Sequence, residues 1–196
     1  MGTETTFEKL TQASMLEFSL YGYNGASISK IAHAAGIQKS SLYSHFKSKD
    51  ALFMHAYRCA LDEELINVQN TFSDTQINRN APGFSYCENL VERYDNTPML
   101  KFFLQTSYLS PLHLADEINE LHSAYIQRLT SEFKNTITTY TALKFDTDFY
   151  TEVYISIIDS IQIKLVYTNK ELTKLRLDAL MTLLKHLIGE NNVSFK

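Results

Sequence analysis

Hydrogen-bonding side chains are concentrated in one short stretch, residues 38–46. Leu42 and Phe46 are apolar there and lie four residues apart, as the buried side of a short helix requires. The other positions would face outward with amide, ammonium or hydroxyl groups, which can hydrogen-bond to base edges in the major groove of duplex DNA. The outward residues predicted to contact base edges are Gln38, Lys39, Ser40 and Ser44, with Ser41 on the same face.

A second group of polar residues is suited to holding DNA phosphates. Ser27 and Lys49 stand at expected helix starts, where free backbone N–H groups also attract anions, and Tyr43 and His45 accompany the base-reading residues. Residues 22–49 include four lysines and no Asp or Glu, a local net charge of +4, although the whole chain carries −4. A basic island on an acidic chain favours a nucleic-acid surface.

Aromatic side chains are abundant elsewhere, with 12 Tyr and 12 Phe in the whole chain. Most of them must form the core, but apolar walls with a few hydroxyls are also what small ligands prefer. Pro98 and Pro111 interrupt the apolar segment 98–111, so a gap between helices is expected there. The predicted ligand-binding residues are Phe102, Phe103, Tyr108, Tyr125 and Tyr154.

No motif for catalysis is present. The six glycines are scattered and form no phosphate-binding loop, and neither G-x-S-x-G nor H-E-x-x-H occurs. His113, Asp116, Glu117 and His122 could suggest a metal site, but the two histidines fall on opposite sides of a helix, so a solvated helix face is preferred. We therefore expect no enzyme activity, no metal and no cofactor.

The elements that position the polar side chains can be predicted from the same region. Ser27 is a good helix cap, and Ile28, Ile31 and Ala35 repeat at helical spacing on one apolar stripe. Gly36 then suits a left-handed turn into the second helix. Two helices joined in this way, the second with donors on its outer face, form a helix-turn-helix DNA reader. The alternative is a solvated helical hairpin with no partner.

These motifs together resemble the N-terminal domain of the tetracycline-repressor (TetR) family of bacterial regulators over residues 10–52. The resemblance is carried by Gly22-Tyr23, Ser27-Ile28, Ile31-Ala32, Ala34-Ala35-Gly36-Ile37, Leu42-Tyr43, His45-Phe46-Lys47-Ser48-Lys49 and Leu52. Gln38 and Ser40 depart from the family pattern on the reading face, so the operator sequence cannot be taken from relatives. The resemblance implies a ligand-responsive transcription factor, usually a repressor, in which an effector tilts the helix that follows the reader.

The remainder of the chain favours an all-α fold. Only three prolines and six glycines occur in 196 residues, and 44% of the residues are hydrophobic. Residues 1–48 are predicted to form a three-helix helix-turn-helix module, and residues 49–196 a helical ligand-binding and dimerisation domain. Beyond the module, helical patterns occupy about 49–72, 84–94, 99–109, 114–140, 147–167 and 172–188, with a polar loop at 73–83.

The last two of these helices are joined by a short connection and must pack as an antiparallel hairpin. The final helix has a wide apolar face, and Ser156, Ser160 and Ala179 would permit close packing. In the TetR family this hairpin pairs with its copy in a second subunit, which implies a homodimer on a palindromic operator. The alternative is a hairpin buried within one monomer. The apolar face comprises Leu175, Ala179, Leu180, Leu183, Leu184, Leu187 and Ile188.

No apolar run approaches membrane-spanning length and no signal-peptide pattern begins the sequence, so we expect a cytoplasmic protein without a membrane partner. Cys59 and Cys87 are expected to be reduced packing residues, with a redox switch as the rival interpretation. The predicted function is a repressor released from its operator by a small apolar or aromatic effector. The alternatives are a dimeric helical sensor or adaptor without DNA binding, and an enzyme that uses the aromatic pocket.

Overall fold

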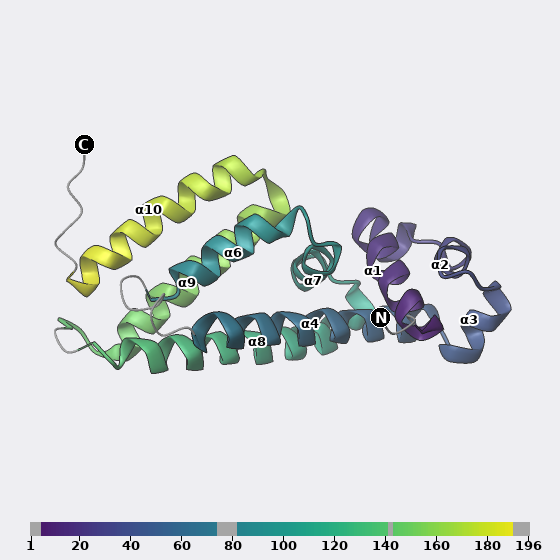
Figure 1. Ribbon diagram of the computed structural model, residues 1–196, viewed down its shortest axis with the longest axis horizontal. Helices are drawn as coiled ribbons and strands as arrows, with labels where there is room; N and C mark the ends of the chain where they lie inside the picture. The colour runs from purple at the N-terminus through teal and green to yellow at the C-terminus, as the bar shows by residue number, and fades with distance from the viewer. Residues whose placement is uncertain (1–4, 74–81, 141–142, 190–196) are drawn as a thin grey trace. The chain divides into compact units, whose positions relative to one another are not determined.

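The computed structural model describes residues 5–73, 82–140 and 143–189. Every regular element in these ranges is a helix, which confirms the predicted all-α class (Figure 1). Residues 74–81, which make up most of the predicted polar loop, lie outside the described ranges. The elements are α1 (Thr6–Gly25), α2 (Ile28–Ala34), α3 (Lys39–His45), α4 (Lys49–Ser73), α6 (Phe84–Tyr94), α7 (Pro98–Tyr108), the 3-10 turn η1 (Leu112–Leu114), α8 (Ala115–Ile137), α9 (Thr147–Tyr167) and α10 (Lys170–Ile188).

The chain divides into two compact units. Unit 1 comprises residues 1–64 and 95–122, and unit 2 comprises residues 65–94 and 123–196. Two of the three boundaries along the chain fall inside α4 and α8, so each of these helices contributes to both units, and the third lies between α6 and α7. The division into a DNA-binding module ending at residue 48 and a second domain is a statement about function, and it stays a prediction.

Unit 1 is built around aromatic side chains from three helices. Phe18 of α1 lies 4.8 Å from Phe53 of α4 and 5.9 Å from Phe102 of α7, measured between ring centroids. All three side chains are almost completely buried. Such a cluster fixes α1 on the helices beside it, because burying a large aromatic side chain is worth about 1.5–3 kcal/mol. The first helix of the reader module is therefore anchored to α4 and α7 by buried aromatic packing.

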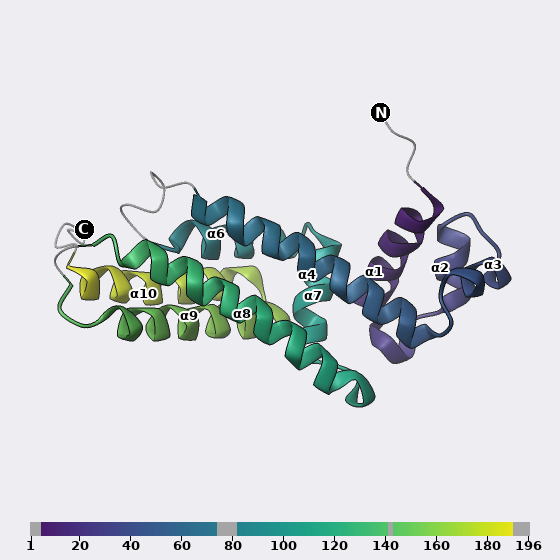
Figure 2. The same ribbon diagram turned by 90° about the horizontal axis from the view of Figure 1, so that it is seen from below.

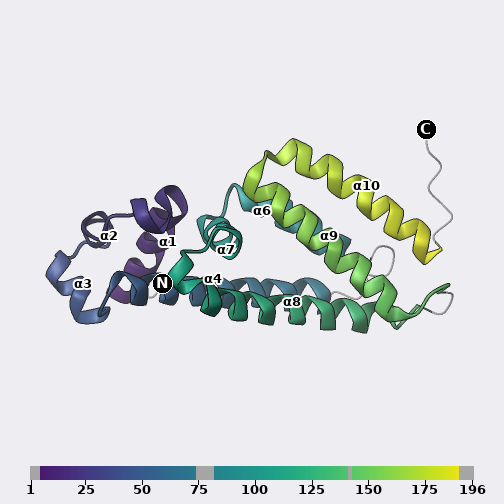
Figure 3. The same cartoon turned by 180° about the vertical axis from the view of Figure 1, so that it is seen from behind.

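Unit 2 contains the predicted hairpin of α9 and α10, which run side by side in opposite directions (Figures 2 and 3). Thr168 and Asn169 connect them, and the Asn169 side chain accepts a hydrogen bond from the Leu172 N–H at 3.0 Å, capping α10. At the other end, Gly189 is left-handed with φ of 97° and ends the helix, as expected. Within the described ranges, no helix is both long and apolar enough to cross a membrane.

Candidate nucleic-acid interface

The first helix of the reader and its turn form as the sequence predicts. Ser27 caps α2, and its side-chain oxygen accepts a hydrogen bond from the Lys30 N–H at 3.4 Å. Gly36 has φ of +75°, and the Ile37 N–H donates to the Ala32 carbonyl at 2.9 Å across the turn. The buried stripe consists of Ile28, Ile31, Ala32 and Ala35. This turn sets the direction in which α3 leaves α2.

The second helix presents the predicted polar face. Leu42 and Phe46 are buried, and Gln38 occupies the helix cap without using its side chain as a cap. The Gln38 amide is therefore available to a partner. The Ser44 hydroxyl donates to the Ser41 carbonyl at 2.6 Å, so its lone pairs are what it offers outward. The exposed residues are Gln38, Lys39, Ser40, Ser41, Tyr43, Ser44 and His45, which are all the predicted contacts from this helix.

The two remaining predicted phosphate ligands, Ser27 and Lys49, are brought close together. The Lys49 ammonium donates to the carbonyl of Ala26, the residue before Ser27, at 2.8 Å. It also lies 4.9 Å from the centre of the Tyr23 ring. The Ser27 N–H donates to the Glu17 carboxylate at 3.0 Å, which places a negative charge beside this junction. Both residues thus have structural partners as well as the phosphate role predicted for them.

The far end of α3 is held by an aromatic contact that the sequence analysis did not identify. Phe46 stacks on Phe7 of α1 at 5.5 Å, and His55 of α4 lies 5.2 Å from Phe46. The His55 ring also contacts the Thr11 hydroxyl at 3.1 Å. Burial, with a smaller contribution from the Arg58 charge, lowers the pKa of His55. A neutral imidazole at this position fixes α3 against α1 and α4.

A second cluster missed by sequence reasoning joins the end of α1, the start of α4 and η1. The Tyr23 hydroxyl donates to the Asp50 carboxylate, which is also 3.3 Å from His113 Nε2. These hydrogen bonds lower the pKa of Asp50, and burial together with the Asp50 contact raises the pKa of Tyr23 to about 12. The three residues are far apart in the chain, and no local pattern could have paired them.

The candidate metal ligands do not gather. His113 faces Asp50, whereas Glu117 forms an ion pair with Arg58 and His122 lies 6.1 Å from the Phe103 ring. In the part of the chain that the structure describes, no three His, Cys, Asp or Glu side chains converge as metal ligands would.

The five predicted ligand-binding residues are distributed between the two units. In unit 1, Phe102 packs in the aromatic cluster with Phe18 and Phe53, as described above. Phe103 lies 5.6 Å from Tyr57, and the Tyr108 ring is 5.7 Å from His122. These contacts are those of a packed core. The ligand-binding role of Phe102, Phe103 and Tyr108 stays a prediction.

In unit 2, Tyr125 and Tyr154 are completely buried in a hydrogen-bonded network. The Tyr125 hydroxyl is 2.7 Å from the Tyr86 hydroxyl and accepts a hydrogen bond from the Gln162 amide at 2.5 Å. The Tyr154 hydroxyl donates to the Gly83 carbonyl at 3.1 Å, and its ring stacks on Phe133. These contacts, too, are those of a packed core, and the ligand-binding role of Tyr125 and Tyr154 stays a prediction.

The cysteines have the character of packing residues. Cys87 is buried in unit 2, where desolvation raises the pKa of its thiol to about 12. Burial and two nearby carboxylates, Asp62 and Glu63, raise the pKa of Cys59. Both thiols are therefore poor sources of thiolate near neutral pH, which disfavours the redox-switch interpretation.

The helix α10 carries two apolar stripes rather than one wide face. Leu177, Met181, Leu184 and Ile188 are buried against unit 2. Leu175 and Leu183 are instead 68% and 62% exposed. Helix α9 also carries exposed apolar side chains, because Phe149 and Ile163 are 41% and 43% exposed. The sequence pattern could not separate the two stripes, because both repeat at helical spacing.

Residues 10–56 match the family model described as bacterial regulatory proteins of the tetR family. The chain is also similar to the negative transcriptional regulator IcaR of the biofilm operon icaADBC from Staphylococcus aureus (strain Newman), with 34% identity over 55 residues. That alignment covers 28% of this chain and 30% of IcaR, so the match spans less than a third of either protein. The predicted resemblance to the TetR family is confirmed.

Solved structures extend the similarity of fold to the whole chain. A TetR-like transcriptional regulator from Rhodococcus sp. RHA1 superimposes with a TM-score of 0.60 at 18% identity, covering 96% of both chains. The transcriptional regulator FadR from Bacillus subtilis, solved in complex with stearoyl-CoA, gives a TM-score of 0.63 at 17% identity and covers 96% of this chain and 100% of its own. At these identities the similarity establishes the fold alone.

Proposed function

Because residues 10–56 belong to the tetR family of bacterial regulatory proteins, we propose that this chain is a ligand-responsive transcriptional regulator that binds duplex DNA through α3. The observation that carries the proposal is the exposed row of donors on α3 above a buried Leu42 and Phe46. A short helix with this face fits the major groove, and the surrounding lysines complement phosphates. A footprint on DNA flanking its own gene tests the proposal.

The active form is a homodimer in the cytoplasm, bound to a palindromic operator. Exposed leucines on α10 and aromatic and aliphatic residues on α9 give unit 2 an apolar outer surface, which favours a partner of the same kind. A shallow pocket of about 530 Å3 on this surface is lined by Ser156, Ser160 and Leu183, among others. Ser156, Ser160 and Ala179 would let two hairpins approach closely.

A small apolar or aromatic effector releases the DNA, so that the protein acts as a repressor. IcaR is a negative regulator, and FadR was solved with stearoyl-CoA, which supports both parts of this proposal. In this chain the network of Tyr86, Tyr125 and Gln162 supplies buried hydroxyls and an amide that an effector could engage. Tyr125 and Tyr154, which both belong to unit 2, remain our choice for its contacts. The ligand-binding role of Phe102, Phe103 and Tyr108 stays a prediction.

The signal is an equilibrium between a DNA-competent and a DNA-incompetent state. An effector shifts it only by its difference in affinity for the two states, typically about 1–3 kcal/mol. Helix α4 contributes to both units and begins beside the reader, so it is the element we propose to move. Calorimetric titration measures how many-fold operator DNA weakens the binding of the effector. Titration with DNA must show that the effector weakens DNA binding by the same factor.

A dimeric adaptor without DNA binding is the alternative. It would require the donors of α3 to have lost their partner, yet the cap, the turn and the exposed polar face are all intact. The adaptor hypothesis would be favoured if the protein formed dimers and bound a small molecule but showed no preference for any duplex sequence. The matching family model describes regulatory proteins. The hypothesis of an enzyme would be supported only if the protein converted a bound ligand into a product.

A further inference from the structure

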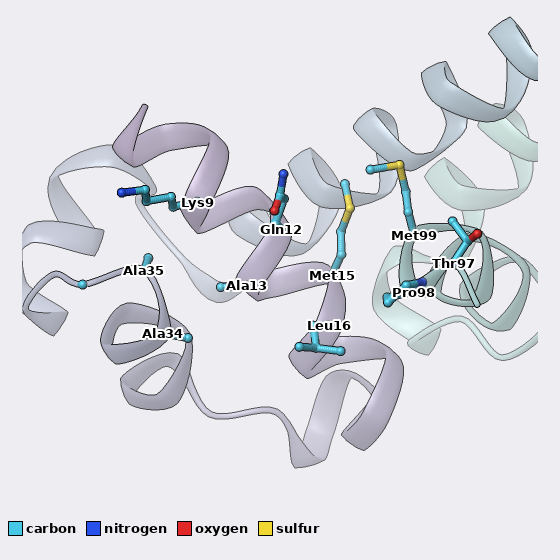
Figure 4. Close-up of a pocket in the computed structure, with 11 residues that line it drawn as sticks. Lys9, Gln12, Ala13, Met15, Leu16, Ala34, Ala35, Thr97, Pro98 and Met99 are labelled. Carbon is cyan, nitrogen blue, oxygen red and sulfur yellow. The ribbon is translucent and has the colours of Figure 1, made fainter. Parts of the chain in front are cut away.

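Unit 1 contains a pocket of about 700 Å3 that none of the predicted ligand residues lines. Its walls come from α1, from the turn between α2 and α3, and from the start of α7 (Figure 4). A volume of about 300–1,000 Å3 is typical of small-molecule sites. The lining residues are Lys9, Gln12, Ala13, Met15, Leu16, Ala34, Ala35, Gly36, Thr97, Pro98 and Met99.

The chemistry of this pocket changes from one end to the other. Lys9, Gln12 and Leu16 follow each other along α1 at spacings of three and four, so their side chains share one face of the helix. The ammonium and amide lie toward the beginning of α1, and Leu16 lies about 10 Å further along the axis at 1.5 Å per residue. A ligand lying along α1 would therefore meet a positive charge at one end and apolar groups at the other.

The apolar end is formed by two methionines from different helices. Met15 of α1 and Met99 of α7 both line the pocket, and Figure 4 labels the two side chains. Thioether sulfur makes favourable contacts with aromatic rings. Met15 is almost completely buried, Met99 is partly exposed and Leu16 is 47% exposed, and together they make this part of the lining apolar. Such a lining favours an aromatic ring over a strongly polar ligand.

We propose that this pocket binds an aromatic carboxylate, with its ring between Met15 and Met99 and its carboxylate at Lys9. A two-ring carboxylate is about as long as the distance along α1 from Lys9 to Leu16. The Gln12 amide can donate a second hydrogen bond to the same carboxylate. The site is additional to the effector contacts proposed above and does not rest on the proposed function.

A ligand in this site would contact the reader module directly. Ala34, Ala35 and Gly36 line the pocket and also make the turn that leads into α3. A bound ring therefore holds that turn to α1 and to the start of α7. This gives a small molecule a route to the reader that lies entirely within unit 1.

The test is a titration of the full chain, labelled with 13C in its methionine methyl groups, with 2-naphthoate. An aromatic ring shifts the resonances of methyl groups beside it, and the five methionines are assigned by Met→Leu variants. We expect saturable ring-current shifts of Met15 and Met99 and no shift of Met181, which is buried in unit 2. A response of Met181 without Met15 and Met99, or no saturable shift at all, would overturn the proposal.

Two variants and one uncharged probe test the chemistry of the site. Lys9→Gln should raise the Kd for 2-naphthoate about two- to fivefold, as expected for an exposed ion pair. Met99→Gln, a swap of similar volume at a half-exposed residue, should raise it about three- to tenfold. The control Lys30→Gln removes the same charge from α2 outside the pocket and should leave the Kd for 2-naphthoate unchanged.

The uncharged 2-naphthalenemethanol should bind the wild type more weakly than 2-naphthoate does. On Lys9→Gln the two probes should bind with equal affinity. Equal binding of both probes to the wild type would overturn the assignment of a carboxylate ligand. Thermal melts followed by circular dichroism establish that each variant is folded, and the methyl spectrum of Met181 reports the integrity of unit 2 in the same sample.

Discussion

The Lys49 ammonium donates a hydrogen bond to the backbone carbonyl of Ala26 at 2.8 Å. This bond ties the first residue of α4 to the residue before the Ser27 cap of α2. A lysine ammonium has three donors, so it can hold this carbonyl and still reach a phosphate. Lys49 is thus placed to link the position of the reader to the start of the helix that we propose to transmit the signal.

Lys49→Ala should weaken DNA binding by a similar factor on all sequences. One phosphate contact is lost, so the slope of log K against log salt should become shallower by about one unit. Fluorescence anisotropy at several salt concentrations measures this slope. Lys185→Ala, which removes the same charge from unit 2, is the matched control and should leave the slope unchanged. An unaltered slope for Lys49→Ala would argue for a purely structural role.

Substitutions on the outer face of α3 should change sequence preference. Gln38 does not cap its own helix, so Gln38→Ala removes only an outward amide and should leave the fold intact. Loss of one good base contact costs about 1–3 kcal/mol at the base that is read and little at other positions. Lys39→Ala should act in the same way at its own base. Competition among operator variants gives the measurement, and a uniform loss on every sequence would mean that these residues contact only the backbone.

The two adjacent leucines of α10 should separate dimerisation from folding. Leu183 is 62% exposed and Leu184 is completely buried. Leu183→Glu should give a folded monomer, because the charge stays in water until a partner covers it. Leu184→Glu should instead destabilise the monomer by several kcal/mol, since an unpaired charge would be buried. Light scattering and circular dichroism distinguish the two effects, and a wild type that is monomeric at micromolar concentration would refute the dimer.

Acidification should loosen the contact between α3 and its supports through His55. Burial, and then the Arg58 charge, lower its folded-state pKa below the unfolded value of about 6.5. The unfolded chain therefore binds the proton more readily, so stability is constant above about pH 6.5 and falls as the pH drops below it, levelling off below the folded-state pKa. Urea unfolding of the wild type between pH 5 and pH 8, values chosen to bracket about 6.5, should show this decline. His55→Gln removes the titration, and a decline of equal size in that variant would assign the effect to carboxylates.

Local patterns sufficed to predict the helices and the reader, because caps, turns and buried stripes act within a few residues. The structure shows the expected cap at Ser27 and the expected left-handed turn at Gly36. Asn169 lies in the expected short connection, and its side chain also caps α10. The contacts of His55 with Thr11 and of Tyr23 with Asp50 join residues 44 and 27 positions apart, and no local rule pairs them. The same limit explains the pocket of Met15 and Met99, whose walls meet only through tertiary packing.

The most direct test of the central claim is a footprint of the full chain on duplex DNA flanking its own gene. We predict protection of an inverted repeat whose half-sites lie about one helical turn or a multiple of it apart, at salt concentrations where nonspecific duplex is displaced. Gln38→Ala should lose preference for this site while retaining weak, salt-sensitive binding to any duplex. Protection spread equally over all sequences, with wild type and variant indistinguishable, would contradict the account.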